Sequence, residues 1–241
     1  MTATEQIPSL SVVIPVYNEE STIDQVLTAV SDQEIVTEIV IIDDCSQDNS
    51  PAIIIREADR LESKRPELKV LFFQNEKNKG KGGSLKKGFQ HTTGDVIVIQ
   101  DADLEYDPQE YTNLIRPIAA GQADVVYGSR FIGGTHRVLY YWHYLGNKTL
   151  TLLSNMFSNL NLTDMETCYK MFRREILDGI EFKSSRFGFE PEFTAKVARA
   201  GLRIYEMPIS YHGRTYNDGK KITWRDGLAA IFHIIRYNVF R

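Results

Sequence analysis

The sequence predicts an α/β fold with a mostly parallel sheet flanked by helices, and three features of its first half lead to this prediction. Short runs rich in valine and isoleucine recur, stretches of helical length separate them, and polar residues follow the end of each run. Strands buried on both faces are nearly continuous apolar runs, and their alternation with helices is typical of a parallel sheet. Ligands bind such sheets beyond the carboxyl ends of the strands. The residues directly after each run are therefore the candidates for a functional site.

Five runs are expected to be strands and four segments to be helices. The strands are expected at Leu10–Pro15, Glu38–Asp43, Leu68–Gln74, Asp95–Gln100 and Ala123–Gly128. The helices are expected at about Glu20–Asp32, Ser50–Glu62, Ser84–Thr92 and Pro108–Ala120. After Arg130 the alternation stops, and the sequence contains no repeat, low-complexity segment or Pro/Gly-rich linker. We therefore expect one domain over residues 1–222, whose halves at about 8–130 and 131–222 share a core, followed by a C-terminal amphipathic helix over residues 223–241.

The overall composition excludes several classes of protein. A chain of 241 residues, of which 42% are hydrophobic and 25% charged, has the balance of a globular domain rather than of a disordered or fibrous chain. A formal net charge of −4 argues against a protein that coats nucleic acid. Cys45 and Cys168 form no C-x-x-C pair, which is typical of a reducing compartment. Residues 1–9 do not have the pattern of a secretory signal, and no apolar segment reaches the roughly 18–20 residues of a membrane span, so a cytoplasmic location is expected.

Three carboxylates follow the fourth expected strand. Asp101, Asp103 and Glu105 alternate along the chain, so a regular strand would point them to one side. Carboxylates crowded on one side repel each other unless a cation lies among them, and oxygen-only ligands suit Mg²⁺ or Mn²⁺. The sequence therefore predicts a divalent-metal site at these residues. The alternative is an Asp-rich loop that caps the helix expected near Pro108.

Asp43 and Asp44 end the second expected strand. A carboxylate at a strand end is suited to hydrogen-bonding a nucleobase N–H or a ribose hydroxyl. The alternative is a cluster at the start of the next helix, because Asp and Ser side chains accept hydrogen bonds from the free N–H groups there. We expect both roles, with Asp48 or Ser50 as the cap.

A glycine-rich basic segment, Asn78–Ser84, opens the third expected helix. The N–H groups and the dipole of a helix N-terminus favour an anion, and Lys81 adds a positive charge, so the segment is a candidate site for a phosphate. A flexible basic turn is the alternative. The segment is not a Walker loop, since Lys81 precedes the closing glycines, and it is not G-x-G-x-x-G, since Leu85 occupies the last position.

The second half of the chain contains basic and acidic candidates of its own. Arg214 and Lys221 lie in the segment His212–Lys221, where arginine is suited to bidentate bonds with phosphate and lysine adds a point charge. A solvated basic loop is the alternative. Glu190 and Glu192 are expected in the first turn of a helix, where acidic residues are favoured even without a catalytic role.

Together these segments resemble the family-2 glycosyltransferases with the GT-A fold. The motifs that carry the resemblance stand in the family's order: Pro15-Val-Tyr-Asn-Glu19, Ile42-Asp-Asp-Cys-Ser-Gln-Asp48, Asn78-Lys-Gly-Lys-Gly82, Asp101-Ala-Asp-Leu104 and Gly128-Ser-Arg130. A narrower similarity, to the polyprenyl-phosphate or dolichyl-phosphate hexose synthases, rests on Asp164-x-x-Thr-Cys-Tyr-Lys170, Phe187-Gly-Phe-Glu-Pro-Glu192, and Glu206-Met-Pro-Ile-Ser210 leading to Arg214. The resemblance covers about Leu10 to Arg236, and the combination of motifs is specific although no single motif is.

The resemblance implies an inverting, metal-dependent transfer of a hexose from a nucleoside diphosphate sugar to a polyprenyl or dolichyl phosphate. It implies that the nucleoside is held by Pro15, Tyr17, Glu19, Asp43 and Asp44. It also implies that Mg²⁺ or Mn²⁺ is bound by Asp101 and Asp103 with the residue at position 105, and that the donor and acceptor phosphates are surrounded by Arg130, Arg214 and Lys221. The half at 8–130 would then serve the nucleotide and the metal, and the half at 131–222 would serve the acceptor.

Two details of the sequence bear on this resemblance. Glu105 stands where the mannosyl branch often carries an amide, and a further anionic ligand should bind the metal more tightly. The stretch Glu166-Thr-Cys-Tyr-Lys170 looks like that of bacterial glucosyl-type relatives, so UDP-glucose is favoured as the donor and GDP-mannose comes next. A lipid phosphate is already an anion at neutral pH, so such an acceptor needs little help from a general base.

Two other functions remain as alternatives. A family-2 transferase with a saccharide acceptor would need a carboxylate base, for which Glu192 and Asp164 are the candidates. A non-catalytic, membrane-associated protein that binds sugar nucleotides is the other. The residues that argue against it are the intact Asp101, Asp103, Arg130 and Arg214.

Two segments predict contact with a membrane surface rather than a span. From Trp224, apolar residues recur at the helical positions Leu228, Ile231, Phe232, Ile235 and Val239. Residues 138–163 contain aromatic side chains and leucines with Lys148 as the only full charge, a composition that suits the interfacial zone of a bilayer. We therefore expect a peripheral protein on the cytoplasmic face of a membrane. The alternatives are that both stripes pack on the core, or that a homo-oligomer buries them.

Overall fold

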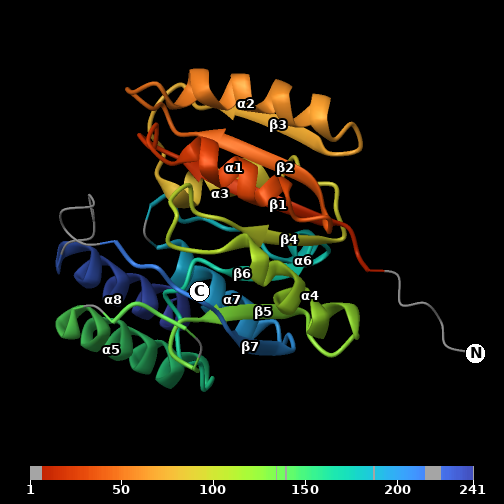
Figure 1. Ribbon diagram of the computed structural model, residues 1–241. Helices are drawn as coiled ribbons and strands as arrows, with labels where there is room; N and C mark the ends of the chain where they lie inside the picture. The colour runs from red at the N-terminus through yellow and green to blue at the C-terminus, as the bar shows by residue number, and fades with distance from the viewer. Residues whose placement is uncertain (1–6, 134, 139, 187, 215–223, 241) are drawn as a thin grey trace, which may run out of the picture.

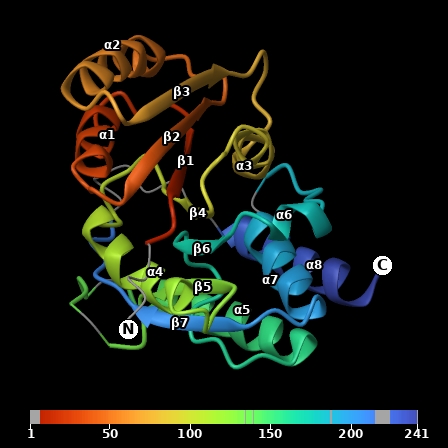
Figure 2. The same ribbon diagram turned by 90° about the vertical axis from the view of Figure 1, so that its right-hand side faces the viewer.

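The computed structural model describes residues 7–133, 135–138, 140–186, 188–214 and 224–240 (Figure 1). These residues form a seven-stranded sheet in the order β3-β2-β1-β4-β6-β5-β7. Neighbouring strands are parallel except at β6, which is antiparallel to both β4 and β5. Helices cover both faces, with α1 on one side of the N-terminal strands and α3 on the other (Figure 2). The predicted fold class, a mostly parallel α/β sheet flanked by helices, is confirmed.

The first half contains the expected strands and helices, with shifted ends. Its elements are β1 (Leu10–Val16), α1 (Ile23–Ser31), β2 (Val36–Asp43), α2 (Ser50–Lys64), β3 (Lys69–Gln74), α3 (Lys81–Phe89), β4 (Val96–Ile99), the short 3₁₀ helix η1 (Pro108–Glu110), α4 (Tyr111–Ala119) and β5 (Val125–Ser129). The residues of β4 are all buried, which agrees with a strand covered on both faces. Helix α3 begins at Lys81 rather than at Ser84, because Gly80, with φ at 75°, turns the chain into the helix earlier than the hydrophobic pattern indicated.

The second half adds two strands that the sequence analysis did not predict. Its elements are α5 (Tyr141–Ser158), β6 (Lys170–Arg173), α6 (Ile176–Gly179), α7 (Phe189–Arg199), β7 (Ile204–Pro208) and α8 (Trp224–Val239). Strand β6 has four residues and begins with a charged one, so it lacks the long apolar run that marked the other strands. It nevertheless lies between β4 and β5, and it thereby joins the two halves in one sheet. Helix α7 carries Glu190 and Glu192 in its first turn, as expected.

Helices α5 and α8 pack against each other and against α7, and Figure 2 shows the three helices grouped beside the strands of the second half. The side chains of α8 that are buried here are Ala230, Ile234 and Tyr237. The predicted apolar stripe instead contributes exposed side chains, since Leu228, Phe232, Ile235 and Val239 are all more than a third exposed. Within the described ranges, none of the helices is both long and apolar enough to cross a bilayer.

Candidate active site

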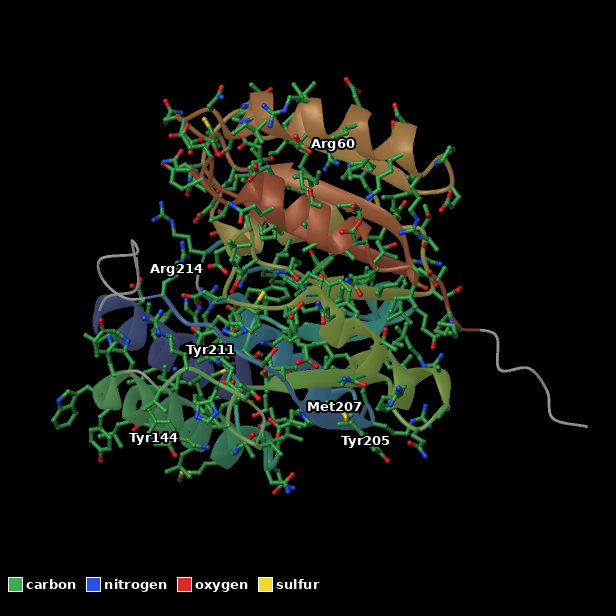
Figure 3. The ribbon with its side chains drawn as sticks, in the orientation of Figure 1. Arg60, Tyr144, Tyr205, Met207, Tyr211 and Arg214 are labelled. Atoms are coloured by element: carbon green, nitrogen blue, oxygen red, sulfur yellow. The ribbon has the colours of Figure 1, made fainter. Side chains whose placement is uncertain are left out.

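The loops after the parallel strands meet at one edge of the sheet, on the left in Figure 1. Parallel strands direct their carboxyl ends the same way, so the residues that follow β1, β2, β4, β5 and β7 come together there. Most of the residues that the sequence singled out lie in these loops. Figure 3 shows Arg214, on the loop that follows β7, at this edge.

Arg214 lies among three carboxylates from two other loops. Its Nη2 is 2.6 Å from Oδ2 of Asp103, its Nε is 3.4 Å from Oε1 of Glu105, and its Nη1 is 3.5 Å from Oε2 of Glu19. The backbone N–H of Arg214 also donates to Oε1 of Glu105 at 2.8 Å, and the Tyr211 hydroxyl donates to Oε2 of the same carboxylate at 2.8 Å. The loop of the second half is therefore fastened to the acidic loop after β4.

Asp101 is neutralised by a different cation. The Lys81 ammonium, at the start of α3, lies 2.9 Å from Oδ1 of Asp101 and 3.0 Å from Oε1 of Glu190. Burial acts to raise the pKa of Asp101, but the charge and the hydrogen bond of the Lys81 ammonium, with smaller contributions from Cys168 and Lys170, together lower it. Lys81, predicted as a phosphate ligand, thus bridges the acidic loop to the first turn of α7.

Asp103 differs from Asp101 in its electrostatic surroundings. Burial, together with the nearby charges of Asp101 and Glu105, raises the pKa of Asp103 to about 7, although the Arg214 guanidinium acts in the opposite direction. The ionised form of a carboxylate in such a position is stabilised by any further cation placed beside it. The pair Asp101 and Asp103 is therefore the part of this site whose charge best suits a divalent metal.

Glu105 and the two aspartates do not form a ready-made metal cage. Among the residues that the structure describes, no group of three or more His, Cys, Asp or Glu side chains is arranged to hold a metal ion. Both carboxylate oxygens of Glu105 accept hydrogen bonds from the loop after β7. The arrangement fits a cation held by Asp101 and Asp103 and completed by phosphate oxygens, which is the way Mg²⁺ is usually bound beside a diphosphate. The predicted role of Glu105 as a third ligand stays a prediction.

Asp43 and Asp44 have distinct surroundings although they are neighbours. Both oxygens of Asp44 are used to shape the glycine-rich segment, since Oδ1 accepts from the Lys79 N–H at 2.9 Å and Oδ2 from the Gly80 N–H at 2.7 Å. Asp43 accepts from the Ser46 N–H and the Gln74 amide through Oδ2. Its Oδ1 is buried and has no hydrogen-bond partner in the described part of the chain. A buried acceptor without a partner is costly, so Asp43 is prepared to receive a donor from a ligand.

Arg130 is held in a bidentate pair with Asp164. Its Nε lies 2.7 Å from Oδ2 and its Nη2 2.8 Å from Oδ1 of that carboxylate. Glu206 in turn accepts the backbone N–H groups of Thr163 and Asp164, which fixes the loop that carries Asp164. The Arg130 guanidinium carbon also lies 5.1 Å from the centre of the Tyr211 ring.

The remaining predicted residues lie in or near the same edge. Tyr17 follows β1 and its side chain is 42% exposed, so it is accessible to a ligand. Pro15 lies inside β1 opposite Ile42 of β2. Lys221 lies outside the described residues. Sequence reasoning missed Tyr211, whose only signal was its place directly after the motif Glu206–Ser210, and it gave Glu206 no role beyond membership of that motif.

Comparison with known families agrees with this geometry. The family described as "Glycosyl transferase family 2" matches residues 11–180, which is more than half of the chain and includes the loops after β1, β2, β4 and β5. The chain belongs to glycosyl transferase family 2.

Similar proteins include, by their names, a hexosyltransferase of glycan biosynthesis and an undecaprenyl-phosphate mannosyltransferase. The chain is 31% identical over 221 residues to the low-salt glycan biosynthesis hexosyltransferase Agl6 of Haloferax volcanii, and this match covers 86% of the chain and 48% of the relative. It is 28% identical over 221 residues to the undecaprenyl-phosphate mannosyltransferase of Micrococcus luteus, with 86% of the chain and 85% of the relative covered. The chain thus spans about half the length of the Haloferax protein and most of the Micrococcus one.

Solved structures of glycosyltransferases share the fold. Glucosyl-3-phosphoglycerate synthase of Mycobacterium tuberculosis, in complex with Mn²⁺ and UDP-glucose, superposes with a TM-score of 0.72 at 20% identity, over 96% of this chain and 79% of that one. The mannosyltransferase PcManGT of Pyrobaculum calidifontis, in complex with GDP-mannose and Mn²⁺, gives a TM-score of 0.67 at 22% identity, over 96% and 63% of the two chains. At these identities the likeness establishes the GT-A type of fold.

Proposed function

We propose that this family-2 member transfers a hexose from a nucleoside diphosphate sugar to a polyprenyl phosphate at a membrane surface, with the help of Mg²⁺ or Mn²⁺. The observation that carries the proposal is a continuous line of contacts. It runs from the carboxylates after β4, through Tyr211 and Arg130, to the exposed apolar helix α5. Cationic side chains that suit a phosphate would then lie next to the apolar surface of α5.

Each contact along this line is close. The Tyr211 hydroxyl donates to Glu105, and the Tyr211 ring lies against the Arg130 guanidinium. Arg130 also lies 5.4 Å from the centre of the Phe131 ring, whose edge meets Tyr144 of α5 with 5.3 Å between ring centres. Figure 3 shows Arg214, Tyr211 and Tyr144 in this order down one side of the molecule. A lipid phosphate could reach Arg214 and Arg130 while its chain stays on the apolar side.

The hydrogen bonds of the candidate bases favour a phosphate acceptor over a saccharide. Both oxygens of Asp164 are taken by Arg130. Glu192 accepts from the Lys183 and Ser184 N–H groups and from the Lys196 ammonium. A carboxylate occupied in this way is a poor general base, whereas an acceptor phosphate brings its own anionic oxygen. This supports a single displacement in which the phosphate oxygen bonds to the anomeric carbon while the bond to the diphosphate breaks with its electron pair.

The donor side is assigned to the loops of the first half. The unpartnered Oδ1 of Asp43 is suited to accept the ring N–H of a nucleobase, and uracil and guanine both offer one. We propose UDP-glucose as the first donor to test and GDP-mannose as the second. Asp101 and Asp103 would hold the metal, which supplies positive charge to the departing diphosphate.

The membrane side is assigned to α5 and α8. Trp142 and Met156 of α5 are 76% and 70% exposed, and Phe232 of α8 is 59% exposed. Aromatic and aliphatic side chains with few charges suit the interfacial zone of a bilayer. We propose that this pair of helices lies on the membrane that contains the acceptor, and a homo-oligomer that buries the same surface is the alternative.

A donor panel and one substitution test the proposal. Labelled UDP- and GDP-sugars are incubated with polyprenyl phosphate, and the product is expected in the organic phase. Asp103→Asn should reduce this transfer by about 10²-fold or more, because the variant would hold less tightly the metal whose positive charge stabilises the leaving diphosphate. Chelator should abolish transfer, and Mn²⁺ or Mg²⁺ should restore it.

Asp59→Asn, at an exposed position of α2, is the matched control and should transfer at the wild-type rate. Circular dichroism verifies that both variants fold. Transfer at full rate in the chelated protein would contradict the metal assignment. Label that stays in the aqueous phase with every donor would contradict the lipid acceptor.

A further inference from the structure

The Arg214 guanidinium occupies the position beside Asp103 that a metal ion would need. Its three nitrogens face Asp103, Glu105 and Glu19 at 2.6, 3.4 and 3.5 Å. Less than a quarter of the Arg214 side chain is exposed, and the three carboxylates are less exposed still. Carboxylates with so little solvent exposure repel each other unless a cation compensates their charge. In this structure Arg214 is that cation.

The side chain of Arg214 can leave this position without releasing the loop that carries it. The backbone N–H of Arg214 donates to Oε1 of Glu105, and the backbone N–H of His212 donates to the Glu105 carbonyl oxygen at 2.9 Å. The Tyr211 hydroxyl adds a third bond to the same residue. The main chain is thus anchored by contacts that do not involve the guanidinium.

We propose that Arg214 is the resident counter-ion of this acidic cluster, and that a divalent cation arriving with the donor replaces it at Asp103. A guanidinium and a divalent ion on one carboxylate would repel each other strongly at such distances. The displaced guanidinium then becomes available to the acceptor phosphate. The inference rests on the proposed function for the identity of the two phosphates, and it implies that donor and metal bind before the acceptor.

The inference makes an unusual prediction about metal affinity. Arg214→Gln removes the competing cation, so Mn²⁺ should bind this variant about tenfold more tightly than the wild type, in the absence of nucleotide. Free Mn²⁺ is counted by electron paramagnetic resonance during the titration. Arg137→Gln is the control, since it removes an equal charge beside the same loop, where the Arg137 guanidinium donates to the Gly213 carbonyl. The control should change the affinity much less.

Thermal unfolding provides a second measurement. Without metal, Arg214→Gln should melt at a lower temperature than the wild type, because three carboxylates lose their counter-ion. Saturating Mn²⁺ should raise its melting temperature by more than it raises that of the wild type. An arginine that served only to hold the loop would produce the first effect without the second.

Equal or weaker Mn²⁺ binding in Arg214→Gln would overturn the inference. Should that variant fail to fold, Arg214→Met takes its place, because methionine keeps an unbranched apolar stem but carries no positive charge to compete with the metal. It should bind Mn²⁺ more tightly than the wild type, and unchanged affinity would again overturn the inference. These measurements need neither sugar donor nor lipid, so a failure of the proposed transfer reaction would be seen separately.

Discussion

Glu166 lies among charged side chains of the second half, and its Oε1 is buried with no hydrogen-bond partner among the described residues. Burial, followed by the charge of Glu190, raises the pKa of Glu166 to about 7, although Lys170 and Arg130 act in the opposite direction. Lys170 itself donates to the carbonyl oxygens of Met165 and Thr167 rather than to Glu166. The folded protein therefore holds the proton of Glu166 more tightly than the unfolded chain does.

This difference predicts a pH dependence of stability. A carboxyl whose pKa is raised on folding contributes its full stability below the pKa of the unfolded chain, and that contribution is lost as the pH rises towards about 7. Glu166→Gln should therefore stabilise the protein at pH 8, by at most about 3.5 kcal/mol at about 1.4 kcal/mol per pKa unit. The gain should shrink towards pH 4.

Denaturant unfolding at a series of pH values measures this effect. Glu175→Gln is a suitable control because Glu175 is exposed, and it should leave the pH profile unchanged. A gain in Glu166→Gln that is the same at pH 4 and pH 8 would contradict the assignment.

The positions of some site residues were predictable, and those of others were not. Asp101, Asp103 and Arg214 meet because each follows the end of a strand, and the carboxyl ends of parallel strands share one edge. The pairing of Arg130 with Asp164 joins residues 34 positions apart and depends on a loop that precedes β6. No local pattern encodes such a pair. The sequence likewise did not indicate that Arg214 and Lys81 would neutralise the carboxylates proposed for the metal.

Among the elements, the strands of the first half were easier to predict than those of the second. Strand β2 is a long apolar run buried along nearly its whole length, so its sequence alone marks it. Strand β6 is short, and β7 is an edge strand with only partly buried or exposed residues, so neither shows the apolar run of a central strand. Their positions follow from tertiary pairing with β4 and β5, which a local pattern does not reveal.

Helix α5 is the element on which the membrane proposal depends most. Among its 18 residues, Thr151 and Ser154 are the buried ones, while Leu152 and Met156 are strongly exposed. A helix that buries small polar residues and exposes leucine and methionine has its apolar surface on the outside. In a water-soluble monomer the reverse is usual, because burial of apolar area drives packing.

Replacement of both exposed residues tests this element. The wild-type protein should float with liposomes that contain anionic lipids, and Leu152→Glu with Met156→Glu should remove it from the floating fraction. Ile55→Glu with Tyr205→Glu is the matched control, because both residues are exposed but lie on α2 and β7. Flotation of the control and not of the α5 variant supports the proposal. If the wild type stays at the bottom and forms a dimer in ultracentrifugation, the surface is an oligomer interface instead.

At the scale of the whole molecule, the two halves are joined at the glycine-rich segment. The N–H of Gly83 donates to the Ser185 carbonyl at 3.1 Å, and a Cβ on Gly82 would lie 2.5 Å from the Ser184 carbonyl oxygen. The loop at Ser184 is in turn held by Glu192 of α7 and by the Tyr237 hydroxyl of α8. Through this contact, Lys81 and the donor loops are placed relative to the helices assigned to the membrane.

Gly82→Ala should therefore disturb both the stability and the donor site. The added methyl group collides with a backbone oxygen that cannot rotate away, and overpacking of this kind costs about 1–3 kcal/mol. Because the collision pushes the Ser184 loop away from α3, the affinity for the nucleotide donor should also fall, measured by calorimetry beside denaturant unfolding. Gly146→Ala is the matched control, since nothing lies within 4 Å of the added carbon in the middle of α5, and it should raise stability by up to about 1 kcal/mol without a change in donor affinity. If Gly82→Ala were as stable as the wild type and bound the donor equally well, the close contact between the two halves would not be what positions the donor loop.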